Sequence, residues 1–194
     1  MDNELFILDA SVTINILGSG FEDRIFSALH GKWIVARAVS NETHRHPLNS
    51  ARIGDLLGAF VSSGIIQRID VPTEVSGRRY ELALPPYDLD DGEAAAIAVA
   101  EHLEGTLVID EEKGRNVAAS SPACKNILSS TDVFRHPIVM HTLGTDLPIA
   151  IESSLKNSRM RVLVNDTRWI VDKIGRPQAM LYPSLRKNMA RLGI

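Results

Sequence analysis

Short apolar runs alternate along this chain with longer segments that have helical spacing. Five runs rich in apolar and β-branched residues predict buried strands, at residues 5–9, 33–36, 65–71, 106–109 and 126–129. The run 5–9 ends in Asp9, and the run 106–109 is followed directly by Asp110. Apolar strands that alternate with helices are typical of a parallel sheet covered by helices on both faces.

The segments between these runs predict helices. They are expected over residues 11–17, 21–29, 37–45, 50–63, 90–104, 113–120 and 133–143, and near 147–157, 162–174 and 184–192. Ser11 is the expected N-cap of the first, Asp90 or Asp91 of the alanine-rich one, and Asp132 of the segment 133–143. Pro137 is expected to interrupt that last segment.

One stretch has neither pattern. Residues 72–87 contain Pro72, Pro85 and Pro86, and they predict an irregular connection in which residues 79–84 form a helical turn or an extended piece. With 194 residues, 44% of them hydrophobic, the chain is long enough for one domain with a sizeable core. We therefore expect an α/β domain over residues 1–150 and a basic helical extension over 151–194.

Composition also bears on the compartment. No apolar run approaches the length that spans a membrane, and the N-terminus leads directly into a strand, so we expect neither a membrane partner nor a signal peptide. Cys124 is the only cysteine, which excludes an internal disulfide. A cytoplasmic location is the expectation.

The charge is divided unevenly along the chain. Residues 1–151 carry 12 Lys/Arg and 21 Asp/Glu, a net charge of −9, whereas residues 152–194 carry 9 Lys/Arg and 3 Asp/Glu, a net charge of +6. A basic extension on an acidic body suggests contact with an anion such as a nucleic acid. The alternative is a solvated extension whose charge only balances the body.

Four carboxylates occupy matched places in the predicted fold. Asp9 and Asp110 follow strands, Glu42 lies in the helix after the second strand, and Glu93 lies in the first turn of the alanine-rich helix. Because parallel strands end at one edge of a sheet, the four carboxylates are expected to converge there. Clustered carboxylates repel one another unless a cation joins them, and oxygen ligands suit Mg²⁺ or Mn²⁺.

Each acid also has a simpler interpretation. Asp9 and Asp110 are in positions where helix caps are common, and Glu93 is favoured by the helix dipole. Glu42 taken alone is typical of a solvated helix residue. Composition and spacing therefore leave both the metal site and the capping roles open.

Four segments together resemble the PIN domain, a nuclease fold found in many prokaryotic toxin–antitoxin toxins. They are Leu8-Asp9-Ala10-Ser11, residues 34–42 with Glu42, the segment 89–100 with Gly92-Glu93, and the segment 107–118 with Asp110, Lys113, Gly114 and Arg115. The second pair resembles the Gly-Glu branch of the family. The order and spacing agree over residues 4–145.

The resemblance implies a three-layer α/β/α fold with a five-stranded parallel sheet and a Mg²⁺- or Mn²⁺-dependent endoribonuclease. It implies catalytic roles for Asp9, Glu42, Glu93 and Asp110, of which Asp9, Glu93 and Asp110 would bind the metal. Products with 5′-phosphate and 3′-hydroxyl ends are expected. Substrate contacts are implied for Ser11, Lys113 and Arg115. An antitoxin protein and a second copy of the chain in a homodimer are the other partners implied.

Two other function classes stay open. A PIN-like module without tight metal binding would hold RNA or dock a partner, with the basic extension as its electrostatic contact; this reading rests on Arg159, Arg161, Arg168, Lys173, Arg176, Arg186, Lys187 and Arg191. A phosphoryl-transfer enzyme would use an acid at a strand end as nucleophile and form an aspartyl phosphate. The second is less favoured, because paired acids after the first strand and a lysine after the last are not evident.

Overall fold

The sheet is parallel throughout, as the apolar runs predict. The structure, a computed structural model, describes residues 4–43 and 50–194. Within these ranges five strands form one sheet in the order β3-β2-β1-β4-β5. The strands are β1 (Glu4–Leu8), β2 (Gly31–Ala36), β3 (Ile66–Ile69), β4 (Thr106–Val108) and β5 (Asn126–Leu128). Leu8 in the central strand pairs with Val35 on one side and Val108 on the other, so strand ends align at one edge.

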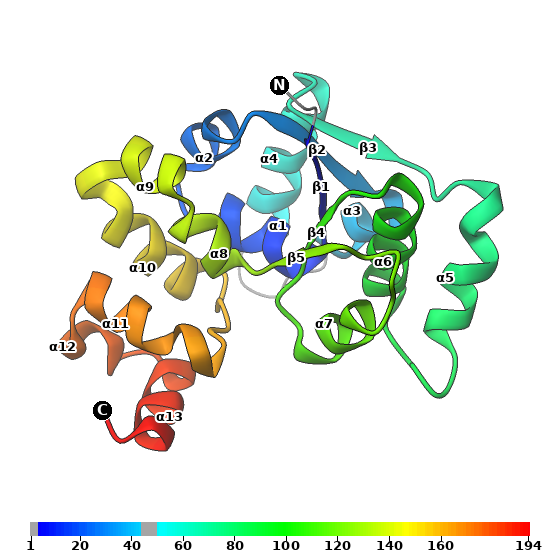
Figure 1. Cartoon of the computed structure of the whole chain (residues 1–194). Helices are drawn as coiled ribbons and strands as arrows, with labels where there is room; N and C mark the ends of the chain where they lie inside the picture. The colour runs from blue at the N-terminus through cyan, green and yellow to red at the C-terminus, as the bar shows by residue number, and fades with distance from the viewer. Residues whose placement is uncertain (1–3, 44–49) are drawn as a thin grey trace.

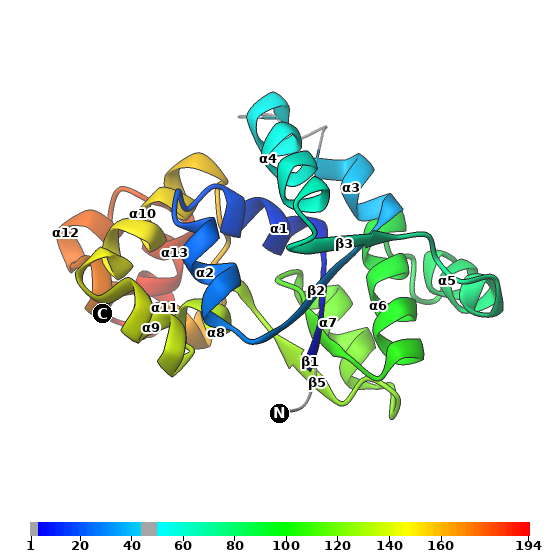
Figure 2. The same ribbon diagram turned by 90° about the horizontal axis from the view of Figure 1, so that it is seen from above.

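Helices cover both faces of this sheet and confirm the three-layer α/β/α class (Figures 1 and 2). One face is covered by α6, which contacts three of the strands, and α1 and α2 lie on the other side. The helices of the first part of the chain are α1 (Ala10–Leu17), α2 (Glu22–Ala28), α3 (Arg37–Thr43), α4 (Ser50–Ser62), α5 (Ser76–Ala83), α6 (Asp91–Leu103) and α7 (Glu112–Ala119).

The helices that follow the last strand lie together beyond α1 (Figure 1). They are α8 (Ser130–Arg135), α9 (Pro137–Leu143), α10 (Leu147–Asn157), α11 (Thr167–Ile174), α12 (Arg176–Ala179) and α13 (Pro183–Leu192). Three short 3₁₀ turns, η1 (Thr73–Val75), η2 (Gly144–Asp146) and η3 (Val164–Asp166), connect elements. No helix among residues 4–43 and 50–194 is both long and apolar enough to cross a bilayer.

Helix α6 packs closely on the sheet because its buried side chains are small. Its alanines from Ala94 to Ala100 are fully buried, which lets the helix backbone approach the strands closely. Asp90 caps its N-terminus: the Asp90 carboxylate accepts from the Glu93 amide at 2.8 Å, and the Glu93 side chain accepts from the Asp90 amide at 3.3 Å. Glu104, with φ 51°, ends the helix one residue before the expected Gly105.

Two predicted N-caps are wrong by a few residues. Asp9, not Ser11, caps α1, and its carboxylate accepts from the Ser11 amide at 3.1 Å. Ser129, not Asp132, caps α8, with Asp132 at the third helical position closing a reciprocal pair of hydrogen bonds. The predicted helix over 133–143 is two helices, because Pro137 starts α9 as its first residue.

Of the two alternatives predicted for residues 79–84, a helical turn or an extended piece, the structure has the helix, but α5 is a regular helix that begins three residues earlier, at Ser76. Local sequence carries little helical signal there, but tertiary contacts hold the segment. Arg78 donates to both carboxylate oxygens of Glu101 in α6, at 2.9 and 3.0 Å, and Leu82 is fully buried. The helix predicted over 37–45 is α3 as far as Thr43, and its last two residues lie outside the described residues.

The C-terminal helices are attached to the sheet through α1. Ser154 Oγ donates to the Asn15 carbonyl at 2.7 Å, and Ser158 Oγ donates to the Ile14 carbonyl at 2.9 Å. A Cβ on Gly18 would lie 3.2 Å from Ser158 Cβ, so the glycine permits this close approach. The predicted boundary between residues 150 and 151 falls inside α10.

Trp33 should be one of the most sensitive core positions. It is 1% exposed, stacks on Phe6 at 4.5 Å, meets Phe26 edge-on at 5.1 Å and donates from Nε1 to the Phe26 carbonyl. Trp33→Ala should lower the free energy of unfolding by about 3–5 kcal/mol in urea denaturation. Tyr80→Ala, at a site 68% exposed, is the matched control and should change it by less than about 0.5 kcal/mol. Equal losses would contradict this packing.

Candidate active site

The four predicted acids come from four elements at the carboxyl edge of the sheet. Asp9 follows β1 directly, and Asp110 comes two residues after β4. Glu42 lies near the end of α3, and Glu93 lies in the first turn of α6. The structure therefore places all four at the edge that the sequence predicts.

Asp9 is held in place by the residues that follow it. Its Oδ2 accepts from the Ser11 amide at 3.1 Å and from Ser11 Oγ at 2.6 Å. Asp9 is 3% exposed, and this burial raises its pKa to about 6, although the bonds from Ser11 act in the opposite direction. Ser11 thus contacts a predicted metal ligand, while its other side faces the cavity described below.

Glu42 and Glu93 lie close enough to Asp9 to feel its charge. Burial, together with the charges of the neighbouring Asp90 and Asp9, raises the pKa of both to about 7. Glu42 Oε1 accepts from the Gly92 amide at 2.8 Å, which fixes the α3 carboxylate against the start of α6. A Cβ on Gly92 would lie 2.7 Å from the Glu42 carboxyl carbon, so a larger residue beside Glu93 would displace the Glu42 carboxylate from this position.

Asp110 is the most fully bonded of the four. Its Oδ1 accepts from the Ser130 amide at 2.7 Å, and its Oδ2 accepts from Ser130 Oγ at 2.5 Å and from Asn15 Nδ2 at 2.8 Å. Burial raises its pKa above the ordinary value against these bonds. Sequence reasoning missed Asn15 and Ser130, because a polar residue inside a predicted helix or beyond the last strand carries no signal of its partner.

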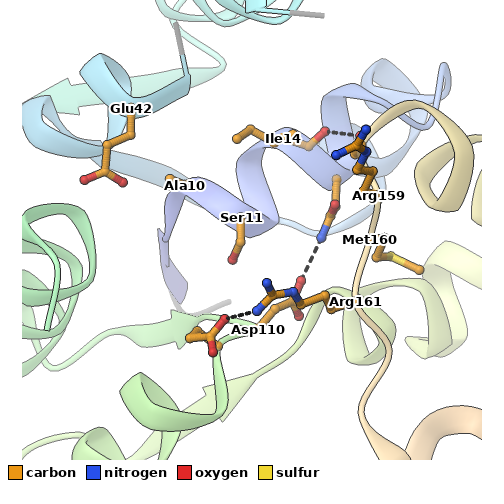
Figure 3. Close-up of a pocket in the computed structure, with 11 residues that line it drawn as sticks. Ala10, Ser11, Ile14, Glu42, Asp110, Arg159, Met160 and Arg161 are labelled. Atoms are coloured by element: carbon orange, nitrogen blue, oxygen red, sulfur yellow. Dashed lines mark hydrogen bonds and ion pairs between the residues drawn. The ribbon is translucent and has the colours of Figure 1, made fainter. Parts of the chain in front are cut away.

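A cavity of about 380 Å³ opens beside these acids (Figure 3). Ser11, Glu42 and Asp110 line one side of it, and Arg159, Met160 and Arg161 from the segment between α10 and α11 line another. Asp9 and Glu93 lie behind this surface, both at most 6% exposed. The C-terminal extension therefore contributes two arginines to a cavity whose other charged residues, Glu42, Asp110 and Glu111, are acidic.

The two predicted substrate-binding bases after β4 have protein partners. Lys113 Nζ donates to the Asp88 carbonyl and lies 3.5 Å from the Asp88 carboxylate. Arg115 donates to the Ile109 carbonyl at 2.9 Å, and its charge lowers the pKa of Asp110. Neither residue lines the cavity. Their predicted contact with substrate stays a prediction.

The donor chemistry of the site suits a hard divalent cation. Its ligands would be carboxylate oxygens with raised pKa values, and a cation would relieve both the desolvation and the mutual repulsion that raise them. Within the described part of the chain, no three His, Cys, Asp or Glu side chains form a ready metal-binding group. The predicted ligands, Asp9, Glu93 and Asp110, already accept hydrogen bonds from protein donors.

Comparison with known families agrees with this geometry. The family model DUF3368, described as a PIN domain, matches residues 5–122. The chain belongs to the PIN-domain family. PIN domains are generally metal-dependent nucleases, and the matched residues include all four acids of the candidate site. The comparisons with curated proteins and with solved structures gave no match.

The buried carboxylates of this PIN domain should make its stability depend on pH. In the folded chain Glu42 and Glu93 hold protons up to about pH 7, whereas unfolded they release them near 4.5. The folded state thus binds more protons between these values, and the free energy of unfolding should fall as the pH rises through that window. Urea denaturation without divalent cations at several pH values measures this loss.

Variants identify the source of that loss. The Glu42→Gln, Glu93→Gln double variant should show a much smaller fall over the same pH window, because the amides do not titrate. Glu112→Gln, at an exposed position in α7, should behave as the wild type. A double variant whose stability falls as steeply as that of the wild type would contradict the assignment.

Proposed function

We propose that this PIN domain is a Mg²⁺- or Mn²⁺-dependent endoribonuclease. The observation that carries the proposal is the position of four acids from four separate elements at one edge of the sheet: Glu42 and Asp110 line one cavity there, and Asp9 and Glu93 lie behind its surface. Buried carboxylates with raised pKa values are costly to a fold. Their convergence beside a solvent-accessible cavity supports a chemical role more strongly than four independent capping roles.

The proposed roles follow from position. Asp9, Glu93 and Asp110 would hold the metal, which when bound would supply positive charge to the scissile phosphate and to the attacking water. Ser11 orients Asp9 through two hydrogen bonds and faces the cavity, where it is placed to meet a phosphate oxygen. Glu42, fixed by the Gly92 amide, lines the cavity and would orient the water and accept its proton.

Cleavage assays test this proposal. Asp9→Asn and Asp110→Asn should each reduce Mn²⁺-dependent cleavage of single-stranded RNA by at least about a hundredfold, since each removes a charged oxygen from the metal site. Asp172→Asn, an exposed acid on α11, is the matched control and should cleave as the wild type does. Products are expected to carry 5′-phosphate ends. An Asp9→Asn protein that is folded and cleaves at the wild-type rate would overturn the mechanism.

A second function is favoured by one observation. Asp9, Glu42 and Asp110 are already bonded by protein donors, and Asp110 accepts three hydrogen bonds. A PIN domain that keeps this arrangement would bind RNA or a protein partner without cutting. RNA binding with no cleavage in Mn²⁺ would favour this alternative over the nuclease.

We further propose that the nuclease serves as the toxin of a toxin–antitoxin pair and acts as a homodimer in the cytoplasm. The support is the family and its four acids. Growth arrest on expression that requires Asp9 and is relieved by a neighbouring gene product would support the toxin role. Harmless expression of an active nuclease would contradict it.

A further inference from the structure

Three hollows meet at Arg161. The cavity beside the acids shares Asp110, Glu111 and Arg161 with a second hollow of about 620 Å³ that extends to α13. It shares Arg159, Met160 and Arg161 with a third, of about 480 Å³, that extends to Tyr182 and Ser184. The three hollows therefore adjoin one another between the acids and the C-terminal helix, and we call them together the groove.

The two walls of this groove have opposite charge. Asp110, Glu111 and Glu112 line the wall that belongs to the sheet and α7. Arg161, Lys187 and Arg191 line the wall that belongs to the C-terminal extension. Arg159 lines the first cavity, which Glu42 also lines. We call Arg159, Arg161, Lys187 and Arg191 the basic wall. In Figure 3, Arg159 and Arg161 both lie on the side of the cavity opposite Glu42.

The basic wall is open to an incoming anion. Among residues 4–43 and 50–194, no carboxylate lies within ion-pair distance of Arg159, Lys187 or Arg191. Arg161 pairs with Glu111 at 2.9 Å, but its side chain is 78% exposed, so the pair is weak and easily exchanged. Lys187 and Arg191 are four residues apart on α13 and therefore project from one face, about 6 Å apart along the axis.

The other basic residues of the extension do not belong to the groove. None of the three hollows is lined by Lys156, Arg168, Lys173, Arg176 or Arg186. Lys173 lies instead over the Trp169 ring at 5.6 Å. The excess positive charge of residues 152–194 is therefore divided into two groups by the fold, and only one of them faces the acids.

We propose that the groove binds the single-stranded RNA next to the scissile phosphate, with backbone phosphates on Arg161, Lys187 and Arg191. This inference rests on the proposed nuclease function, since the acids define where the scissile phosphate lies. Exposed, flexible cations contact phosphates without reading bases, so binding is independent of sequence and steeply dependent on salt. The strand leaves the acids past Arg161 and follows α13.

The test measures binding and cleavage separately. Fluorescence anisotropy with a labelled single-stranded RNA in EDTA reports binding by the full chain without cleavage. Lys187→Glu, Arg191→Glu should weaken binding by at least about tenfold, whereas Arg176→Glu, Arg186→Glu, with the same change in charge, should weaken it far less. The neutral pair Lys187→Gln, Arg191→Gln should reduce the slope of log K against log salt by about 1.4. Circular dichroism establishes that each variant is folded.

The outcomes distinguish the two proposals. Equal losses in the groove variant and the control variant, or no RNA binding by the wild type, would overturn the groove. A wild type that binds RNA through the groove but does not cleave it in Mn²⁺ would leave the groove standing and refute the nuclease. If the wild type cleaves RNA but the groove variant (Lys187→Glu, Arg191→Glu) and the control variant (Arg176→Glu, Arg186→Glu) bind it equally well, the nuclease stands and the groove is refuted.

Discussion

The carboxylates at the carboxyl edge of the sheet are the constraint on which the rest of this structure depends. Burial works against their charged forms, and it raises the pKa of Asp9 to about 6 and those of Glu42 and Glu93 to about 7. The fold offsets this cost with hydrogen bonds from Ser11, Gly92 and Asp90, each supplied by a residue next to one of the acids in sequence or space. Small residues in α6 bring these groups close enough to interact.

Three of the four acids and their place at one edge of the sheet could be predicted from the sequence, because each has a local signal, whereas Glu42 was indicated only by the family resemblance. Asp9 and Asp110 follow apolar runs, and Glu93 opens an alanine-rich helix. Parallel pairing, which apolar strands separated by helices require, then brings the strand ends together. The strands and most helices were predictable for the same reason, because apolar runs and helical spacing of apolar residues are local signals in the sequence.

The features that sequence missed depend on contacts between distant residues. The full extent of helix α5, beyond the turn predicted at 79–84, depends on the contact of Arg78 with Glu101, and Asp110 is held by Asn15 and Ser130, which are 95 and 20 positions away. Caps were misplaced by two or three residues because neighbouring Asp and Ser residues can fill the same role. The uneven charge indicated that the extension contacts an anion, but only the fold shows which of its cations face the acids.

The basic wall of the extension faces Asp110, Glu111 and Glu112 across the groove, although the family match ends at residue 122. The hydrogen bonds from Ser154 and Ser158 to α1 hold the extension against the sheet. They therefore set the position of the segment that carries Arg159 and Arg161. The structure thus joins a PIN domain to a positively charged wall that the family model does not cover.

Calorimetric titration with Mn²⁺ tests the central claim most directly. The wild-type chain should bind the ion with a dissociation constant on the order of micromolar, and the Asp9→Asn, Asp110→Asn double variant should show no binding. Binding should also release protons near neutral pH, because the cation lowers the raised pKa values of the remaining acids. Equal binding by both proteins, or binding by neither, would contradict a metal site at these carboxylates.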